Sequence, residues 1–204
     1  MKYKLYKNDF PTTLKFEKDV AIDTETMGLN IHRDRLCLVQ LSSGDGYAHL
    51  VQIPKIIDKK PKNLIGLLEN KNITKIFHFA RFDLAMLQKN VCTVKGPIYC
   101  TKIASKLTRT FGAKHGLRDL CKELLNIELD KENQISDWGK DKLSDEQLMY
   151  AAKDVLYLHQ LKNKLDQLLI REARYSLASD SFKALETRVR LDIEGFQDLD
   201  IFAH

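Results

Sequence analysis

Cysteine is scarce in this chain: it has four in 204 residues, and no two form a CxxC pair. That spacing offers neither a disulfide framework nor a typical zinc site, and it favours buried, reduced thiols. Long apolar runs are also missing. Nothing approaches the ~20 residues of a membrane span, and the N-terminus lacks the apolar stretch of roughly 7–15 residues found in secretory signals. We therefore expect a cytoplasmic protein with no membrane partner.

The sequence has no internal repeat, no low-complexity segment and no linker that would divide it. Its length suits one medium-sized domain, whose core is large enough to need no disulfides. A composition of 44% hydrophobic and 30% charged residues is ordinary for a globular protein. We expect a single α/β domain over residues 1–191.

Acidic residues are in the minority along the body of the chain but not at its C-terminus. Residues 192–204 carry four acids and no Lys or Arg, so the preceding 191 residues hold 33 basic and 24 acidic side chains. A basic body favours a polyanionic partner such as nucleic acid, although many solvated lysine-rich surfaces bind nothing. The acidic, apolar tail over 192–204 is expected at a subunit interface, where its apolar side chains would leave water.

Short apolar runs rich in β-forming residues fill the first half of the chain, at 15–25, 36–43, 46–53 and 73–79. Turn residues 43–46 predict a hairpin between the second and third runs, and the early strands are expected to be largely antiparallel. Helical spacing appears at 63–70, 80–90, 101–109 and 116–126. A capping-box pattern, Ser144 with Gln147, opens one long predicted helix whose apolar stripe runs from Leu148 to Leu168.

Two acids, Asp23 and Glu25, follow the apolar residues 20–22 on a predicted strand. Residues two apart on a strand share a face, so the two carboxylates lie a few ångströms apart. Like charges at that distance repel unless they are protonated or bridged by a cation. Two acids exposed at a strand end would explain the pair equally well, so a lone D-x-E is not specific.

Three further residues favour the cation. Asp83 follows a predicted strand where a helix begins, and Tyr150 and Asp154 share one face of the long helix as an i, i+4 pair. Taken singly, Tyr150 is a core aromatic and Asp154 an exposed acid. Together, the four carboxylates predict an oxygen-rich site for two hard cations, Mg²⁺ or Mn²⁺, roughly 3.5–4 Å apart, as in phosphoryl displacement. Tyr150 would position the attacking water or help to deprotonate it.

The order and spacing of these motifs resemble the DEDDy branch of the ribonuclease H-like (DnaQ-like) 3′–5′ exonucleases. The first motif is VAIDTETMGL at 20–29, the second HFARFD at 78–83, and the third YAAKD at 150–154. Resemblance to ribonuclease D continues through 115–138 and 143–158. It implies a mixed sheet flanked by helices. It also implies a first metal on Asp23, Glu25 and Asp154, and a second bridged by Asp23 and supported by Asp83.

The same resemblance implies substrate contacts around the first and second motifs. Met27 and Leu29 stand where relatives place an apolar wedge against the terminal bases, although core packing explains them equally well. Trp138, the only tryptophan, lies in a polar loop, which favours stacking on a base over burial. The complete set of predicted substrate contacts is Thr24, Met27, Gly28, Leu29, His78, Phe82, Gln134 and Trp138.

Segments 32–46, 100–110 and 200–204 make the chain similar to the compact nanoRNase C enzymes, nearly end to end. That similarity implies degradation of very short RNAs, including the linear dinucleotide made from cyclic di-GMP, by a ring-shaped homo-octamer. Ribonuclease D-like trimming of longer RNA and exonuclease action on DNA are the alternatives with the same chemistry. A catalytically inactive nucleic-acid-binding protein is the alternative from another class. Two departures from the wider family stand out: the helical domains that follow the catalytic domain in ribonuclease D are missing, and Phe79 replaces the Asn of many relatives.

Overall fold

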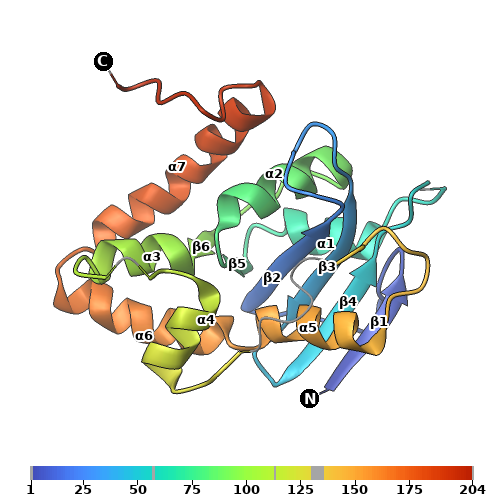
Figure 1. Cartoon of the computed structure of the whole chain (residues 1–204), viewed down its shortest axis with the longest axis horizontal. Coiled ribbons are helices and arrows are strands. Elements are labelled where there is room, and N and C mark those ends of the chain that lie inside the picture. Colours follow the sequence, from blue (N-terminus) through green and yellow to red (C-terminus); the bar gives the residue numbers. More distant parts are fainter. Residues whose placement is uncertain (1, 57, 113, 130–135, 204) are drawn as a thin grey trace.

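The computed structural model describes residues 2–56, 58–112, 114–129 and 136–203, and its centre is a mixed six-stranded sheet (Figure 1). The strand order is β1-β4-β3-β2-β5-β6. The strands are β1 Lys2–Lys7, β2 Asp19–Thr26, β3 Leu36–Ser42, β4 Tyr47–Gln52, β5 Thr74–Phe77 and β6 Ile98–Cys100. Helices pack on the sheet, as expected for an α/β fold of the ribonuclease H-like type.

Strand directions divide the sheet into two kinds of pairing. β2, β3 and β4 form an antiparallel meander, and the predicted turn joins β3 to β4 with Gly44 and Gly46 both at φ 81. The outer pairs β1–β4, β2–β5 and β5–β6 are parallel. The expectation of largely antiparallel early strands therefore holds only for the meander. β1 was not predicted, because lysines interrupt KYKLYK and it contains no apolar run.

The helices are α1 Lys62–Glu69, α2 Ala80–Asn90, α3 Thr101–Thr108, α4 Leu117–Leu120, α5 Asp145–Leu156, α6 Leu158–Arg171 and α7 Tyr175–Ile193, with a short π-helix, η1, at Cys121–Leu125. The predicted helices at 63–70, 80–90 and 101–109 are confirmed, whereas 116–126 divides into α4 and η1. Among the described residues, no helix combines the length and apolarity needed to cross a bilayer.

The prediction of one long helix from residue 144 is wrong. The capping box is present, since Ser144 Oγ accepts a hydrogen bond from Gln147 N and Gln147 Oε1 accepts one from Ser144 N. The helix then breaks at Tyr157, where φ is −104 and ψ is −4, and α6 begins at the next residue. No Pro or Gly occurs between 148 and 168, so the sequence carried no stop signal.

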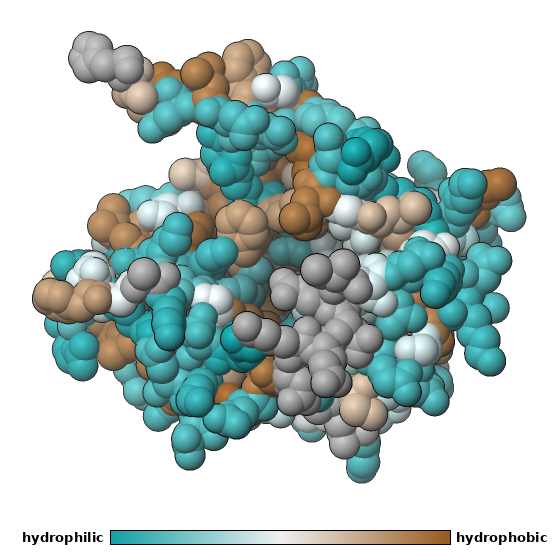
Figure 2. All heavy atoms as spheres, viewed as in Figure 1, coloured by the Kyte–Doolittle hydropathy of each residue, from teal (hydrophilic) through white to brown (hydrophobic). Residues whose placement is uncertain are grey.

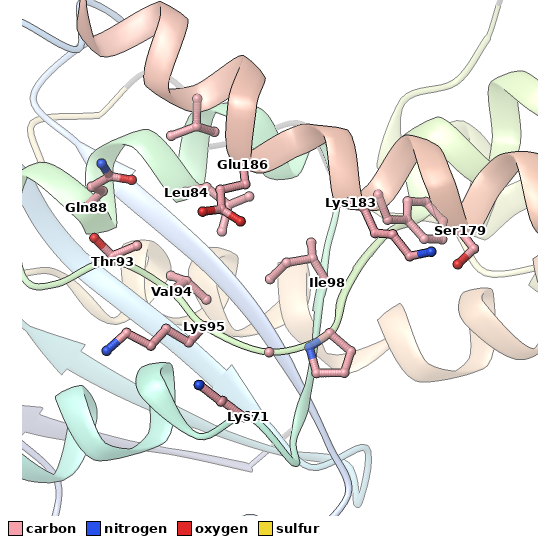
Figure 3. A pocket seen from close by; sticks show the side chains of 14 residues that line it. Lys71, Leu84, Gln88, Thr93, Val94, Lys95, Ile98, Ser179, Lys183 and Glu186 are labelled. Atoms are coloured by element: carbon pink, nitrogen blue, oxygen red, sulfur yellow. The ribbon is translucent and has the colours of Figure 1, made fainter.

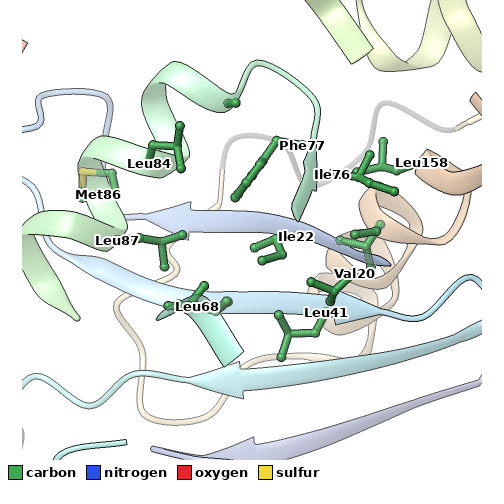
Figure 4. Close-up of a cluster of buried hydrophobic side chains, with 14 of the residues drawn as sticks. Val20, Ile22, Leu41, Leu68, Ile76, Phe77, Leu84, Met86, Leu87 and Leu158 are labelled. Atoms are coloured by element: carbon green, nitrogen blue, oxygen red, sulfur yellow. The ribbon is translucent and has the colours of Figure 1, made fainter. Parts of the chain in front are cut away.

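The core fixes the central strand that carries the first two acids. Val20 and Ile22 of β2 are fully buried, and Figure 4 shows both in one cluster of buried side chains with Leu87 of α2. Each buried aliphatic side chain of this size contributes about 1.5–3 kcal/mol. Because alternate residues of β2 face opposite ways, Val20, Ile22 and Thr24 face α2, while Asp23 and Glu25 face α5. The four cysteines are free, and all but half-buried Cys92 are buried, as predicted.

The C-terminal segment is held by Arg81 and Arg188, which also donate to the backbone carbonyls of residues 196, 197 and 199, while its apolar side chains are exposed. Asp192 is buried near the end of α7, where the guanidinium groups of Arg81 and Arg188 both donate to its carboxylate. Residues 194–203 follow the helix and project from the body (Figure 1), and brown apolar spheres are visible along this segment in Figure 2. Phe202 is 90% exposed.

Candidate active site

Three of the predicted carboxylates converge. Asp23 and Glu25 of β2 and Asp154 of α5 each offer an oxygen, and these three atoms lie within 4.8 Å of one another. The strand alternation supplies the first two ligands on one face, and α5 packs over that face and adds the third. All three side chains are half-buried.

Asp83 is not one of these three ligands and approaches β2 from α2. It belongs to the first turn of α2, is 4% exposed, and accepts a 2.6 Å hydrogen bond from the hydroxyl of Thr24. Thr24 stands between Asp23 and Glu25 in the chain, so its side chain points to the opposite face of the strand. Asp83 is thus joined to the cluster through Thr24 and is near enough to raise the pKa of Glu25. The Thr24 hydroxyl donates to Asp83, and a contact between Thr24 and the substrate stays a prediction.

The carboxylates have unusual acidities. Burial is the main cause that raises the pKa of Asp23, to about 7. Burial, followed by repulsion from Asp23, raises the pKa values of Glu25, Asp83 and Asp154 well above the ordinary carboxylic range. Such a group of acids favours either protons or a cation between them.

Gln40 is a site residue that the sequence reasoning missed. It lies opposite Asp23 in the β2–β3 ladder, is fully buried, and its Nε2 donates to Asp23 Oδ2 at 3.3 Å. The available signal was its polarity within the apolar run LCLVQLSS. An amide at this position holds Asp23 in place without adding charge.

Tyr150 lies one helical turn before Asp154, and their side chains are hydrogen-bonded. Burial first, and then the negative charges of Asp154, Glu25 and Asp23, raise the pKa of Tyr150. The phenol therefore stays protonated at neutral pH and acts as a donor.

The interpretation of Trp138 as an exposed stacking residue is wrong. It is 3% exposed, and its ring centroid lies 6.2 Å from that of Tyr150 at an interplanar angle of 40°. The polar residues around Trp138 suggested an exposed ring, but a large ring in a polar loop can still pack against the core. Trp138 packs beside Tyr150 and limits the positions open to that ring.

The loop after the first motif presents two apolar side chains to solvent. Met27 is 58% exposed and Leu29 84% exposed, so packing in the core does not account for either residue. Gly28 lies between them, and a Cβ there would be 2.3 Å from Asp34 Oδ2, so a larger residue would displace the Asp34 side chain. The same carboxylate accepts the backbone N–H of Asn30 and so shapes the loop. This geometry is compatible with the predicted wedge.

The remaining predicted contacts differ in their environments. His78 is half-buried, with Nδ1 2.8 Å from Thr101 Oγ1, and burial, then the charge of Lys102, lower its pKa to about 3. It is therefore neutral at physiological pH. Phe82 is half-buried beside Asp83. Gln134 lies outside the described residues.

A cavity of about 680 Å³ lies away from the carboxylates, between α2, α7 and the segment leading into β6 (Figure 3). Leu84, Ile98 and Phe182 line it, with Lys71 and Lys95 among the polar groups at its edge. None of the four predicted acids borders it. This cavity therefore does not mark the position of the clustered carboxylates.

A family model described as 3′–5′ exonuclease matches residues 7–170. The chain belongs to the 3′–5′ exonuclease family. Ribonuclease D of Bartonella henselae is 32% identical over 173 residues, which make up 85% of this chain and 42% of that protein. Ribonuclease D of Haemophilus influenzae is 34% identical over 152 residues, 74% of this chain and 37% of that protein. The chain thus spans about two fifths of the length of these relatives.

Solved structures extend the similarity to the whole chain. A structure of Brucella melitensis NrnC with bound Mg²⁺ is 51% identical, with a TM-score of 0.94 and 100% of each chain covered. Brucella melitensis NrnC bound to pGG is 52% identical, with a TM-score of 0.95 over 100% of this chain and 99% of that one. Escherichia coli RNase D is 25% identical, with a TM-score of 0.74 over 85% of this chain and 45% of that one. This 3′–5′ exonuclease is therefore ribonuclease D-like and close to NrnC.

The clustered acids fit a divalent metal. Carboxylate oxygens are the ligands that Mg²⁺ and Mn²⁺ prefer, and three converge here from two elements. Burial, and then repulsion between the carboxylates, raise the pKa values of Glu25 and Asp154. A bound cation would offset both effects and favour the ionised acids. Asp23, Glu25 and Asp154 would hold the ion, and Gln40 would steady Asp23.

Proposed function

We propose that the protein is an exoribonuclease that hydrolyses short oligoribonucleotides from the 3′ end, preferentially dinucleotides such as pGpG, to nucleoside 5′-monophosphates. The observation that carries the proposal is the convergence of Asp23, Glu25 and Asp154 beside Tyr150. Full-length similarity to an NrnC structure bound to pGG supports the choice of a short RNA substrate.

The proposed cofactors are two divalent cations, Mg²⁺ or Mn²⁺. When bound, they would stabilise the negative charge that develops on the attacking and leaving oxygens of an in-line displacement. Asp23, Glu25 and Asp154 are proposed to hold one ion, with Asp23 shared by the second. Asp83, fixed by Thr24, would support the second ion directly or through water.

The protein's own side chains bind and orient the reactants in this proposal. Tyr150 hydrogen-bonds the attacking water and aims it at phosphorus, since its phenol is protonated and its ring is packed beside Trp138. Met27 and Leu29 press between the last two bases from their exposed loop. This wedge would hold the terminal phosphodiester at the carboxylates. His78 and Phe82 belong to the second motif and remain predicted substrate contacts.

The preference for short RNA is part of this proposal and is supported by the similarity to the NrnC structure bound to pGG. The alternatives are trimming of longer RNA 3′ ends and exonuclease action on DNA.

The proposed assembly is a homo-oligomer, an octamer by family resemblance, in the cytoplasm. The tail supports it, because Phe196, Leu199, Ile201 and Phe202 are each at least 44% exposed in the single chain. Apolar side chains gathered on one projecting segment favour a protein interface. Its acids would complement the basic body of a second copy.

The test of substrate class is a comparison of labelled RNAs of two, five and twenty nucleotides, with a dinucleotide of DNA as control, in Mg²⁺, Mn²⁺ or EDTA. We expect the highest kcat/KM on the RNA dinucleotide and no turnover in EDTA. A higher kcat/KM on the twenty-nucleotide RNA or on DNA would contradict the proposed substrate. Binding without hydrolysis in either metal would favour the inactive-binder alternative.

A further inference from the structure

Phe79 has an unusual backbone conformation. Its φ of 72 and ψ of 45 place it in the left-handed region, which bulky side chains seldom occupy. Of the four described non-glycine residues with positive φ, two are asparagines, which tolerate this region. Glycine or asparagine would meet the backbone requirement at residue 79 more easily than phenylalanine does.

The connection from β5 to α2 explains the backbone but not the side chain. β5 ends at Phe77 and α2 begins at Ala80, so the chain must turn within two residues. Phe77 and Ala80 are fully buried, whereas the Phe79 ring is 46% exposed. A strained conformation that exposes a large apolar ring gains little from packing, and strain of this kind concentrates at functional positions.

The surroundings of the ring point to a flat ligand. Lys102 Nζ lies over the ring, 4.2 Å from its centroid, so a cation occupies one face and the other remains for a planar group. Phe79 also borders a hollow of about 290 Å³ together with Leu29 and Phe82. Phe82 directly precedes Asp83, so the hollow adjoins the second acidic motif.

A nucleobase fits this chemistry better than other ligands. Aromatic side chains stack on bases of any sequence because every base has a π-face. Arg81 borders the same hollow but is ion-paired with Asp192, and Asp192 and Asp198 line the hollow as well. The hollow therefore suits the uncharged face of a base, and the positive charge beside the ring is that of Lys102. Leu29 is the most exposed residue of the predicted wedge, so a base entering beside it would meet Phe79.

We propose that Phe79 forms a base-stacking subsite with Leu29 and Phe82, which positions one base of the RNA next to the carboxylates. This inference rests on the proposed function, since it assigns part of the substrate to a place on the protein. The strained backbone at residue 79 is retained because it presents the ring to that base.

Phe79→Ala, Phe79→Gly and Phe79→Asn test the proposal. Loss of stacking should raise KM for a dinucleotide about tenfold or more, with a smaller change in kcat. The effect should vanish for a dinucleotide carrying an abasic ribose at the stacked position, because the ring then has no partner to lose. Phe79→Gly should melt at or above the wild-type temperature, since glycine adopts positive φ without strain. Phe111→Ala is the matched control, because it removes a fully exposed ring away from Phe79. Phe111 borders neither the hollow described above nor a second one lined by Phe79 and Lys102, so KM should not change.

Two results would overturn the stacking subsite: an unchanged KM in Phe79→Ala, or an equal rise in KM with intact and abasic substrates. A marked fall in melting temperature for Phe79→Gly would assign the ring to packing instead. Affinity for a dinucleotide with a non-hydrolysable methylene linkage, measured by calorimetry, gives the same comparison without turnover. A wild-type enzyme that degrades long RNA but not dinucleotides would contradict the proposed function. In that case the calorimetric affinities of the wild type and of Phe79→Ala for the non-hydrolysable dinucleotide would still test the stacking subsite.

Discussion

The hydroxyl of Thr24 donates a 2.6 Å hydrogen bond to Asp83, which lies 59 residues further along the chain. Both side chains are buried, and strand alternation places the Thr24 side chain on the face of β2 opposite Asp23 and Glu25. The bond therefore ties the start of α2 to the strand that presents the clustered acids. Asp83 is therefore fixed by Thr24, whereas Asp23, Glu25 and Asp154 form the three-residue candidate metal site.

Replacing Asp23, Glu25, Asp83 or Asp154 with alanine should abolish turnover without unfolding the protein. Removal of one repelling acid from the metal-free cluster should leave the melting temperature unchanged or higher. Asp83→Ala should be the least stable of the four, because it also deprives Thr24 of its partner, at a cost of about 1–3 kcal/mol. Near wild-type Mg²⁺-dependent turnover in any variant would remove that residue from the site.

Thr24→Val keeps the size of the side chain and removes only the donor to Asp83. We expect reduced but measurable turnover, because the three clustered ligands remain, and a melting temperature below that of the wild type. Full turnover at ordinary Mg²⁺ concentrations would mean that the position of Asp83 does not depend on Thr24.

Metal-free stability should fall as pH rises. In the folded protein, burial raises the pKa of Asp23 to about 7 and moves those of Glu25, Asp83 and Asp154 in the same direction. Between the unfolded value near ~4 and about 7, the folded state holds more protons than the unfolded state, so the free energy of unfolding decreases with pH. Melting temperatures from about pH 5 to 7.5 in EDTA should decline, and Mg²⁺ should restore them at the upper end with release of protons. Asp154→Asn should flatten the slope, and a rise in metal-free stability over this range would contradict the account.

Tyr150→Phe should slow the single-turnover rate by about 10²–10⁴-fold, the usual contribution of a positioned proton donor or acceptor. Substrate affinity should change little, because the ring and its packing against Trp138 remain. Rapid-quench measurements with excess enzyme separate the two quantities. An unaltered single-turnover rate would reduce Tyr150 to a packing residue.

The sequence predicted the elements that carry the motifs because their patterns are local. The predicted bounds of α2 match the structure, and the capping box before α5 is present. β6 is three residues long and β1 is rich in lysine, so neither contains an apolar run that a local reading detects.

The site was predictable where spacing determines geometry, and not where contacts cross the fold. Strand alternation places Asp23 beside Glu25, and the helical period places Tyr150 beside Asp154. Nothing local indicates that Thr24 binds Asp83, that Gln40 donates to Asp23, or that Trp138 folds inward. Each of these contacts joins residues from different elements.

Deleting residues 195–204 should dissociate the proposed oligomer and relax the preference for dinucleotides. This truncation keeps Asp192, whose ion pairs with Arg81 and Arg188 belong to the fold of the single chain. Light scattering and turnover of five-nucleotide RNA measure the two effects. A full-length monomer at micromolar concentration, or a truncated chain that keeps its assembly, would contradict the proposal.

The most direct test of a metal-dependent 3′–5′ exoribonuclease is mass spectrometry of the products from a five-nucleotide RNA of mixed sequence, with Asp154→Ala as the inactive control. The account predicts that Mg²⁺ supports release of the 3′-terminal residue first, as a nucleoside 5′-monophosphate, followed by its neighbours in order. Neither EDTA nor the variant should yield products. Release from the 5′ end, internal cleavage, or equal product formation in EDTA would contradict it.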